Sequence, residues 1–164
     1  MMKKLLFMIA CGVLVGCDYT VPLVKTPEMA IDSGIVGLWQ KTDEAGQTES
    51  LLILPLNTNE YLIAFPAGST NAMFARACLC HSDGKTLAQL TWIGTAQGAI
   101  PEDNRVFQFA SYSVTGGSLT INLLNADLVK RDVKSSAELA KSIAANKANP
   151  NLYREAMVFK KTRR

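Results

Sequence analysis

The stretch RVFQFASYSVTGGSLTINLL, residues 105–124, decides the fold class. Its first half is an apolar and aromatic run typical of a β-strand, and Gly116 with Gly117 supplies a tight turn. Its second half alternates leucine and isoleucine with threonine and asparagine, the period of a strand with one buried face. The stretch therefore predicts an antiparallel hairpin.

The same pattern recurs on both sides of this hairpin. Upstream and downstream, β-branched and aromatic runs between turn residues predict further strands over 35–40, 49–56, 60–65, 71–81, 86–93 and 155–160. Asp83-Gly84 marks a second tight hairpin. The run from Leu51 to Leu54 is unbroken, which predicts burial on both faces of its strand.

One segment has a helical period instead. Ser135 and Glu138 have the spacing of a capping box, and Leu139 with Ile143 forms an apolar stripe that ends before residues 146–150. We therefore predict a mainly β fold. It is an antiparallel meander of seven to eight strands, curved into a barrel or half-barrel, with one C-terminal helix before the last strand.

The chain begins MMKKLLFMIACGVLVGC, residues 1–17. Two lysines, an apolar run and a small residue before Cys17 are typical of a secretory signal peptide. The apolar run is shorter than the roughly 20 residues of a spanning helix. Residues 14–17 resemble the lipobox of bacterial lipoproteins. That resemblance implies cleavage before Cys17 and a lipid on this cysteine.

These signals predict the domain organisation and the location. Residues 1–16 form the signal peptide, residues 17–33 a tether with two prolines and lipidated Cys17, and residues 34–164 a single β-rich domain. We expect the bacterial cell envelope, with the protein lipid-anchored on the periplasmic side. Asp18 resembles the inner-membrane retention signal of enteric bacteria, which slightly favours the inner membrane.

The charge of the mature chain gives no signature of nucleic-acid binding. Without the signal peptide, 15 basic and 14 acidic residues remain, a net charge of +1. Residues 18–103 hold 10 acids and 4 bases, whereas residues 104–164 hold 4 acids and 11 bases. Two interpretations stay open. The basic half faces anionic headgroups or an acidic partner, or both halves mix over a solvated surface.

Cys78, Cys80 and His81 are a local cluster of potential metal ligands. Thiolates and an imidazole suit zinc or copper. In a regular strand, however, the two cysteines face one way and the histidine the other. The alternative is that both cysteines pack as small buried hydrophobes. We predict no metal and no cofactor, with these three residues as the candidates for one.

The sequence lacks the common catalytic motifs. It contains no G-x-S-x-G, no H-E-x-x-H, no Walker loop and no G-x-G-x-x-G. His81 is the single histidine and lies beside the Asp83-Gly84 turn, a solvated position for a catalytic base. We therefore predict that the protein is not an enzyme.

Gly37-Leu38-Trp39 resembles the G-x-W motif on the first strand of lipocalins, and a late helix before a final strand is similar to that family as well. The resemblance implies a barrel closed at one end by Trp39, with a small apolar ligand inside. The candidate ligand-binding residues are aromatic side chains on predicted strands: Trp39, Tyr61, Phe65, Trp92 and Phe107. The alternative is that these aromatic residues form the core.

Three functions remain open at this point. The first is a lipid-anchored binding module, lipocalin-like, for a small apolar ligand. The second is a protein-interaction or assembly lipoprotein that uses the basic C-terminal half or an exposed edge strand. The third is a metal or redox carrier through Cys78 and Cys80. We expect the membrane as a partner through the lipid, with a small apolar ligand or an envelope protein besides, and no nucleic acid.

Overall fold

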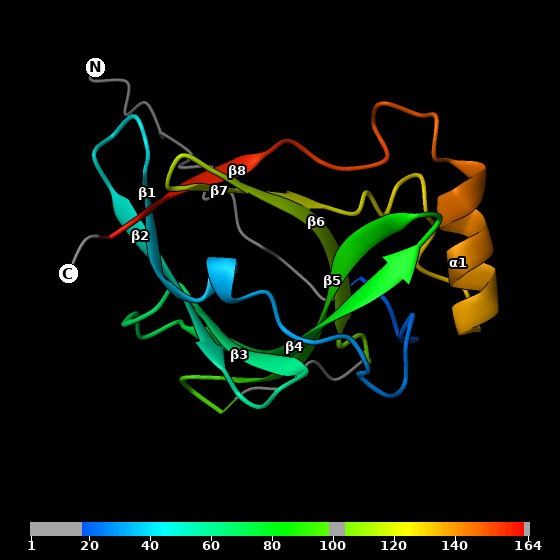
Figure 1. The fold of residues 1–164 in the computed structure, drawn as a ribbon, viewed down its shortest axis with the longest axis horizontal. Coiled ribbons are helices and arrows are strands. Elements are labelled where there is room, and N and C mark those ends of the chain that lie inside the picture. The colour runs from blue at the N-terminus through cyan, green and yellow to red at the C-terminus, as the bar shows by residue number, and fades with distance from the viewer. Residues whose placement is uncertain (1–17, 99–103, 163–164) are drawn as a thin grey trace, which may run out of the picture.

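A computed structural model of the chain describes residues 18–98 and 104–162. It is mainly β, with eight antiparallel strands that pair in sequence order and close into a barrel (Figure 1). The strands are β1 (Gly37–Thr42), β2 (Thr48–Pro55), β3 (Glu60–Phe65), β4 (Met73–Ser82), β5 (Lys85–Thr95), β6 (Phe107–Thr115), β7 (Ser118–Leu123) and β8 (Met157–Lys161). The predicted meander is confirmed, and it forms a closed barrel, not a half-barrel.

The barrel closes where β1 meets β8. Two residue pairs join these strands, Trp39 with Lys161 and Gln40 with Lys160. Thr162 extends the contact, because its N–H and its hydroxyl both donate to the carbonyl of Leu38, at 3.0 and 2.8 Å. Each of the eight described strands thus has a neighbour on both sides. An exposed edge strand among them, one of the two expected routes to a partner, is therefore not available.

Alternation along the strands builds the barrel interior. On β7, Leu119 and Leu123 are buried as predicted. The unbroken run on β2 behaves differently from the prediction: Leu51 and Ile53 point inward and are buried, whereas Leu54 is 40% exposed. The prediction of burial on both faces of this strand was wrong, because no described element covers the outside of β2. The strand has one buried face like its neighbours.

One end of the barrel is closed by the short 3-10 helix η1 (Ser33–Ile35). Ile35 is buried in the interior core, and its carbonyl accepts a hydrogen bond from Nε1 of Trp39 at 2.8 Å. The Tyr61 hydroxyl accepts one from the backbone N–H of Asp32. Two interior aromatic side chains therefore hold this plug in place through their polar atoms.

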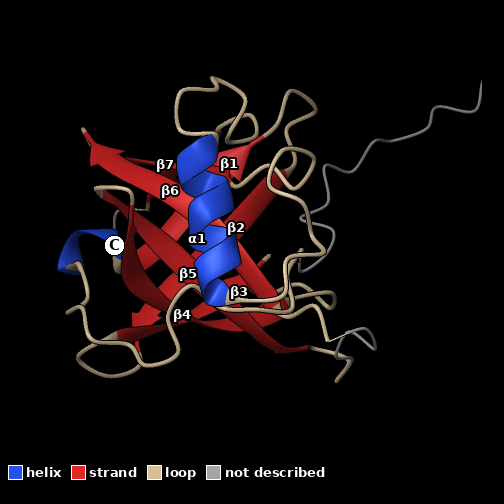
Figure 2. Cartoon of the chain, turned by 90° about the vertical axis from the view of Figure 1, so that its right-hand side faces the viewer, coloured by secondary structure: helices blue, strands red, loops and turns tan. Residues whose placement is uncertain are grey.

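The helix α1 (Ser136–Ala145) lies against the outside of the barrel (Figure 2). Ser135 caps it as predicted, because its hydroxyl accepts from the N–H of Glu138 at 3.1 Å. The Glu138 carboxylate reaches back one residue further than a capping box requires, to the N–H of Lys134 at 2.8 Å. Leu139 and Ile143 are buried, so the predicted stripe is the packed face.

A second core forms under this helix, outside the barrel wall. Its central aromatic residues are Tyr19 and Phe109, whose ring centroids lie 5.4 Å apart. Residues 18–33, expected to be a tether, are packed onto the barrel instead. Tyr19 is fully buried and pairs with Phe107 through backbone hydrogen bonds, and the backbone at 23–24 is bound by Gln89. Asp18 and Tyr19 thus already belong to the packed structure, upstream of the expected boundary at residue 34.

Candidate functional site

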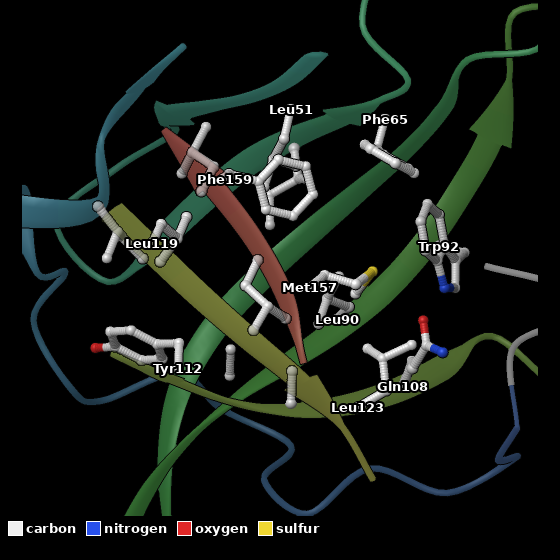
Figure 3. Close-up of a pocket in the computed structure, with 16 residues that line it drawn as sticks. Leu51, Phe65, Leu90, Trp92, Gln108, Tyr112, Leu119, Leu123, Met157 and Phe159 are labelled. Carbon is white, nitrogen blue, oxygen red and sulfur yellow. The ribbon is translucent and has the colours of Figure 1, made fainter. Parts of the chain in front are cut away.

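The barrel interior contains a small apolar cavity of about 70 Å³ (Figure 3). Its wall is mainly aliphatic and aromatic, and it includes Phe65, Trp92, Met157 and Phe159. For comparison, an engineered cavity that holds benzene is about 150 Å³, and pockets for drug-sized ligands start at about 300 Å³. In this conformation the interior is therefore a packed core with a residual void, too small for a typical lipocalin-type ligand.

The five aromatic candidates do not share one site. Phe65 and Trp92 line the cavity. Trp39 and Tyr61 are buried in the same interior core, but their polar atoms bind the plug around η1. Phe107 lies on the outside of the wall, packed against the second core. The structure thus brings together two of the five residues at the cavity.

Cys78 and Cys80 lie on the outer face of β4, opposite Gln89 and Leu87 of β5. Both are free thiols and are buried, at 4% and 1% exposure. Burial raises the pKa of the Cys78 thiol to about 11 and that of Cys80 to about 12. A protonated thiol is a poor nucleophile and a poor metal ligand. These two side chains therefore fill the wall beneath neighbouring segments as small apolar groups.

His81 does not join the two cysteines. It is exposed at the end of β4, where its ring lies 3.4 Å from the hydroxyl of Thr86. Within residues 18–98 and 104–162, no group of three His, Cys, Asp or Glu side chains is placed to hold a metal ion. The expected strand geometry separates this cluster, as the alternation rule requires.

A groove of about 340 Å³ lies between residues 22–27 and the outer wall of the barrel. Its volume is in the range of ligand pockets. Two of its polar side chains, Gln89 and Arg76, are already engaged. Both heavy atoms of the Gln89 amide bind the backbone at 23–24, at 2.7 to 3.0 Å, and the Arg76 guanidinium is bound by Glu60. These bonds fasten residues 22–27 to the wall and leave few convergent polar groups to orient a ligand.

Asp18 forms a buried charged site outside the barrel, which we call the junction, and among the described residues its Oδ2 has no hydrogen-bond partner. The carboxylate is 2% exposed, with Nε of Arg131 3.1 Å from Oδ1 and Nη2 of Arg154 3.6 Å from Oδ2. Burial raises the pKa of Asp18, and the two guanidinium groups oppose that rise. The Asp18 N–H donates to the carbonyl of Phe107 at 3.2 Å. The first described residue is therefore bonded to the barrel wall by its backbone and paired with the segments around Arg131 and Arg154 by its side chain.

The uneven charge along the sequence is partly balanced in space. Arg131 and Arg154, from the basic half, pair with Asp18 from the acidic half. Lys147, near the end of α1, lies 3.4 Å from Asp83 in the β4–β5 turn. These contacts support the second interpretation of the charge pattern, in which both halves mix over one surface.

The outer wall of β1 to β4 carries an uncovered apolar surface. Cross-strand neighbours build it, because Leu38 lies opposite Leu52 and Leu54 lies opposite Leu62. Leu38 is 38% and Leu54 40% exposed. We call this surface the leucine patch, defined by Leu38, Leu52, Leu54, Leu62 and Phe74. None of its members belongs to either hydrophobic core.

Comparison of the chain with protein-family models, curated proteins and solved structures finds no match. The fold and the site geometry are therefore the basis for any functional argument. Among the described residues, no helix has the length and apolar character needed to cross a bilayer.

Sequence reasoning missed both the leucine patch and the junction. The unbroken run Leu51 to Leu54 was the available signal for the patch, and it was interpreted as burial on both faces. For the junction, Asp18 and Tyr19 stand in a proline-containing stretch without periodicity, so no local pattern shows that they are buried. Their partners Arg131 and Val129 lie more than 100 positions further along the chain.

Proposed function

We propose that this chain is a lipid-anchored module of the bacterial cell envelope that binds its partner through the outside of the barrel. The observation that carries the proposal is the junction between the lipobox-like segment and the fold. Asp18, the residue after Cys17, is already buried and paired. Cleavage before Cys17 leaves all of these contacts intact and puts the anchored residue at the first position of the domain.

An outer binding surface is favoured over the barrel interior. The cavity of about 70 Å³ would have to grow several-fold to take an ordinary ligand. The leucine patch, by contrast, needs no rearrangement, because Leu38 and Leu54 are exposed and its other three members are half-buried. Apolar surface of this kind marks interaction sites. We infer an envelope protein as the partner. A small apolar ligand inside the barrel is the second candidate, supported by the apolar lining around Trp92.

The remaining alternatives have less support. A metal or redox carrier needs thiolates, and the pKa of Cys78 and of Cys80 is raised by burial. Asp18 has a structural reason to be acidic, since it pairs with two arginines. Its identity therefore no longer favours the inner membrane, and we place the module on the periplasmic side of the envelope without preferring either membrane.

The anchoring is tested by expressing the full chain in a Gram-negative host and measuring the intact mass of the mature protein. We expect a chain that begins at Cys17 and carries the mass of a lipid, and we expect it to partition into the detergent phase. The matched control is Cys17→Ser, which keeps the preceding apolar run and should lose the lipid. An unmodified Cys17 in the wild-type chain would refute the proposal.

The binding surface is tested with a photo-crosslinking amino acid at position 38, between the side chains of the leucine patch. We expect crosslinks in intact cells that are lost when Leu54→Ser and Leu62→Ser are added. Val114→Ser is the control, because Val114 is similarly exposed, at 41%, but lies outside the patch. Crosslinks that persist in the double variant would show that the patch is not the binding surface. The carrier alternative is checked separately, by the metal content of the protein before and after Cys78→Ser and Cys80→Ser.

A further inference from the structure

The first two described residues, Asp18 and Tyr19, are hydrogen-bonded to the barrel wall. The N–H groups of Asp18 and Tyr19 both donate to the carbonyl of Phe107, at 3.2 and 3.1 Å, and the N–H of Phe107 donates to the carbonyl of Tyr19 at 3.0 Å. Phe107 is the first residue of β6. Consecutive Cα atoms are about 3.8 Å apart, so a lipid on the residue before Asp18 would be attached close to this part of the wall.

The surface beside this junction carries exposed cations together with acids, because Asp127 and Asp132 are exposed in the same segment as Lys130 and Arg131. Tyr19 brings the segment around Val129 to the junction through a hydrogen bond of 2.6 Å to its carbonyl. The next two residues in that segment, Lys130 and Arg131, are exposed. Arg154 completes the group, with its side chain 37% exposed. We call Lys130, Arg131 and Arg154 the junction face. Lys130 and the exposed parts of the two arginines, which share the single carboxylate of Asp18, can contact the phosphate groups of a bilayer surface.

We propose that the module is held directly against the bilayer by its junction face, in one fixed orientation. This inference rests on the proposed lipidation of Cys17. A lipid on Cys17 would be attached one residue before Asp18, whose backbone is bonded to Phe107 at the start of β6. The start of β6 and the residues around Arg131 are then at headgroup level. A lipoprotein with a flexible tether would instead sample many orientations.

The same orientation determines where the leucine patch points. In a closed barrel of eight strands paired in sequence order, β2 is four strands from β6 in either direction, so the two lie on opposite walls. The patch is centred on β2 and β3. It is therefore separated from the junction face by the barrel interior, about 10 Å or more between backbones. The anchored module presents the patch to the aqueous side, where a soluble domain of a partner can reach it.

The test uses the full lipidated chain in vesicles of phosphatidylethanolamine and phosphatidylglycerol with a quencher on the headgroups. A thiol-reactive fluorophore is attached at Asp132→Cys, next to the junction face, or at Leu54→Cys, in the leucine patch. Cys78 and Cys80 are buried and need not be removed, and the Cys17 thiol is occupied by the lipid. We expect quenching several-fold stronger at position 132 than at position 54.

The matched control inserts about 10 Gly and Ser residues between Cys17 and Asp18, a linker that reaches roughly 17 Å. We expect this insertion to remove most of the difference between the two positions. Equal quenching in the chain without the insertion, or an unchanged difference with it, would overturn the inference. The intact mass of each sample separates the two proposals. Equal quenching with acylated Cys17 overturns the orientation alone, whereas unmodified Cys17 overturns the anchoring as well.

Discussion

The hydroxyl of Tyr19 donates a hydrogen bond of 2.6 Å to the carbonyl of Val129, a residue 110 positions further along the chain. Both residues are fully buried. The bond joins the start of the folded domain to the segment that leads into α1. Together with the bonds from Gln89 to residues 23–24 and from Ile31 to Thr58, it holds residues 18–33 against the barrel.

Tyr19→Phe should destabilise the protein by about 1–3 kcal/mol, the cost of leaving a buried acceptor without its donor. The change keeps the ring that packs against Phe109, so the loss reports the hydroxyl itself. Urea unfolding followed by circular dichroism measures the free energy. Tyr112→Phe is the control, since the Tyr112 hydroxyl makes a longer contact of 3.4 Å to Asp32 at an exposed site. Equal losses in the two variants would contradict a special role for Tyr19.

The last strand offers a matched pair of neighbours. Phe159 is 1% exposed inside the barrel, and its ring lies edge-on to Phe65 with centroids 6.0 Å apart. Val158 points outward and is 47% exposed. Phe159→Ala should therefore cost about 3–5 kcal/mol in the free energy of unfolding. Val158→Ala should stay within about 1 kcal/mol. A large effect of both would indicate that β8 is covered on its outer side.

The two thiols should be inert in the folded protein and reactive in the unfolded one. With its pKa raised to about 11, Cys78 carries about one thiolate per thousand molecules at pH 8. The alkylation rate of the folded protein should therefore rise about tenfold per pH unit between pH 7 and 9 and remain well below that of the unfolded chain. The alkylation rate is measured by iodoacetamide labelling of a Cys17→Ser chain, followed by mass spectrometry. Fast labelling of Cys78 at neutral pH would restore the metal or redox alternative.

The strands and the helix could be predicted because their signals are local. Alternation over residues 118–124 and the Ser135 cap depend on neighbours in sequence, and both are confirmed. Closure of the barrel could not be predicted. It depends on two residue pairs between β1 and β8, at opposite ends of the chain, and a twisted open sheet satisfies the same alternation.

The sites were harder to predict than the strands and the helix, because they too depend on segments far apart in the sequence. An aromatic residue on a strand looks identical in sequence whether it lines a cavity, as Trp92 does, or packs outside the wall, as Phe107 does. Side-chain direction follows from register, but what lies on each side of the wall is decided by distant segments. The separation of His81 from Cys80 needed only the alternation rule, and it was therefore predictable.

The interior void allows a direct test of whether the barrel is a packed core or a binding site. Ala110 lines the cavity and is 3% exposed, whereas Ala75 is fully buried in the same core away from it. Ala110→Val adds two methyl groups where there is room. It should be tolerated or stabilise the protein by up to about 1 kcal/mol, as cavity-filling changes do.

Ala75→Val adds the same atoms at a position without space and should destabilise the protein by about 1–3 kcal/mol through overpacking. Both substitutions put a β-branched residue on a strand, so the difference between them isolates the cavity. Urea unfolding of the two variants gives this difference. If the interior instead opens for an apolar ligand, then Ala75→Val is accommodated as easily as Ala110→Val. An environment-sensitive apolar dye would then bind the wild-type barrel and be displaced in the Ala110→Val variant. That pair of results would move the binding site from the outer wall to the interior.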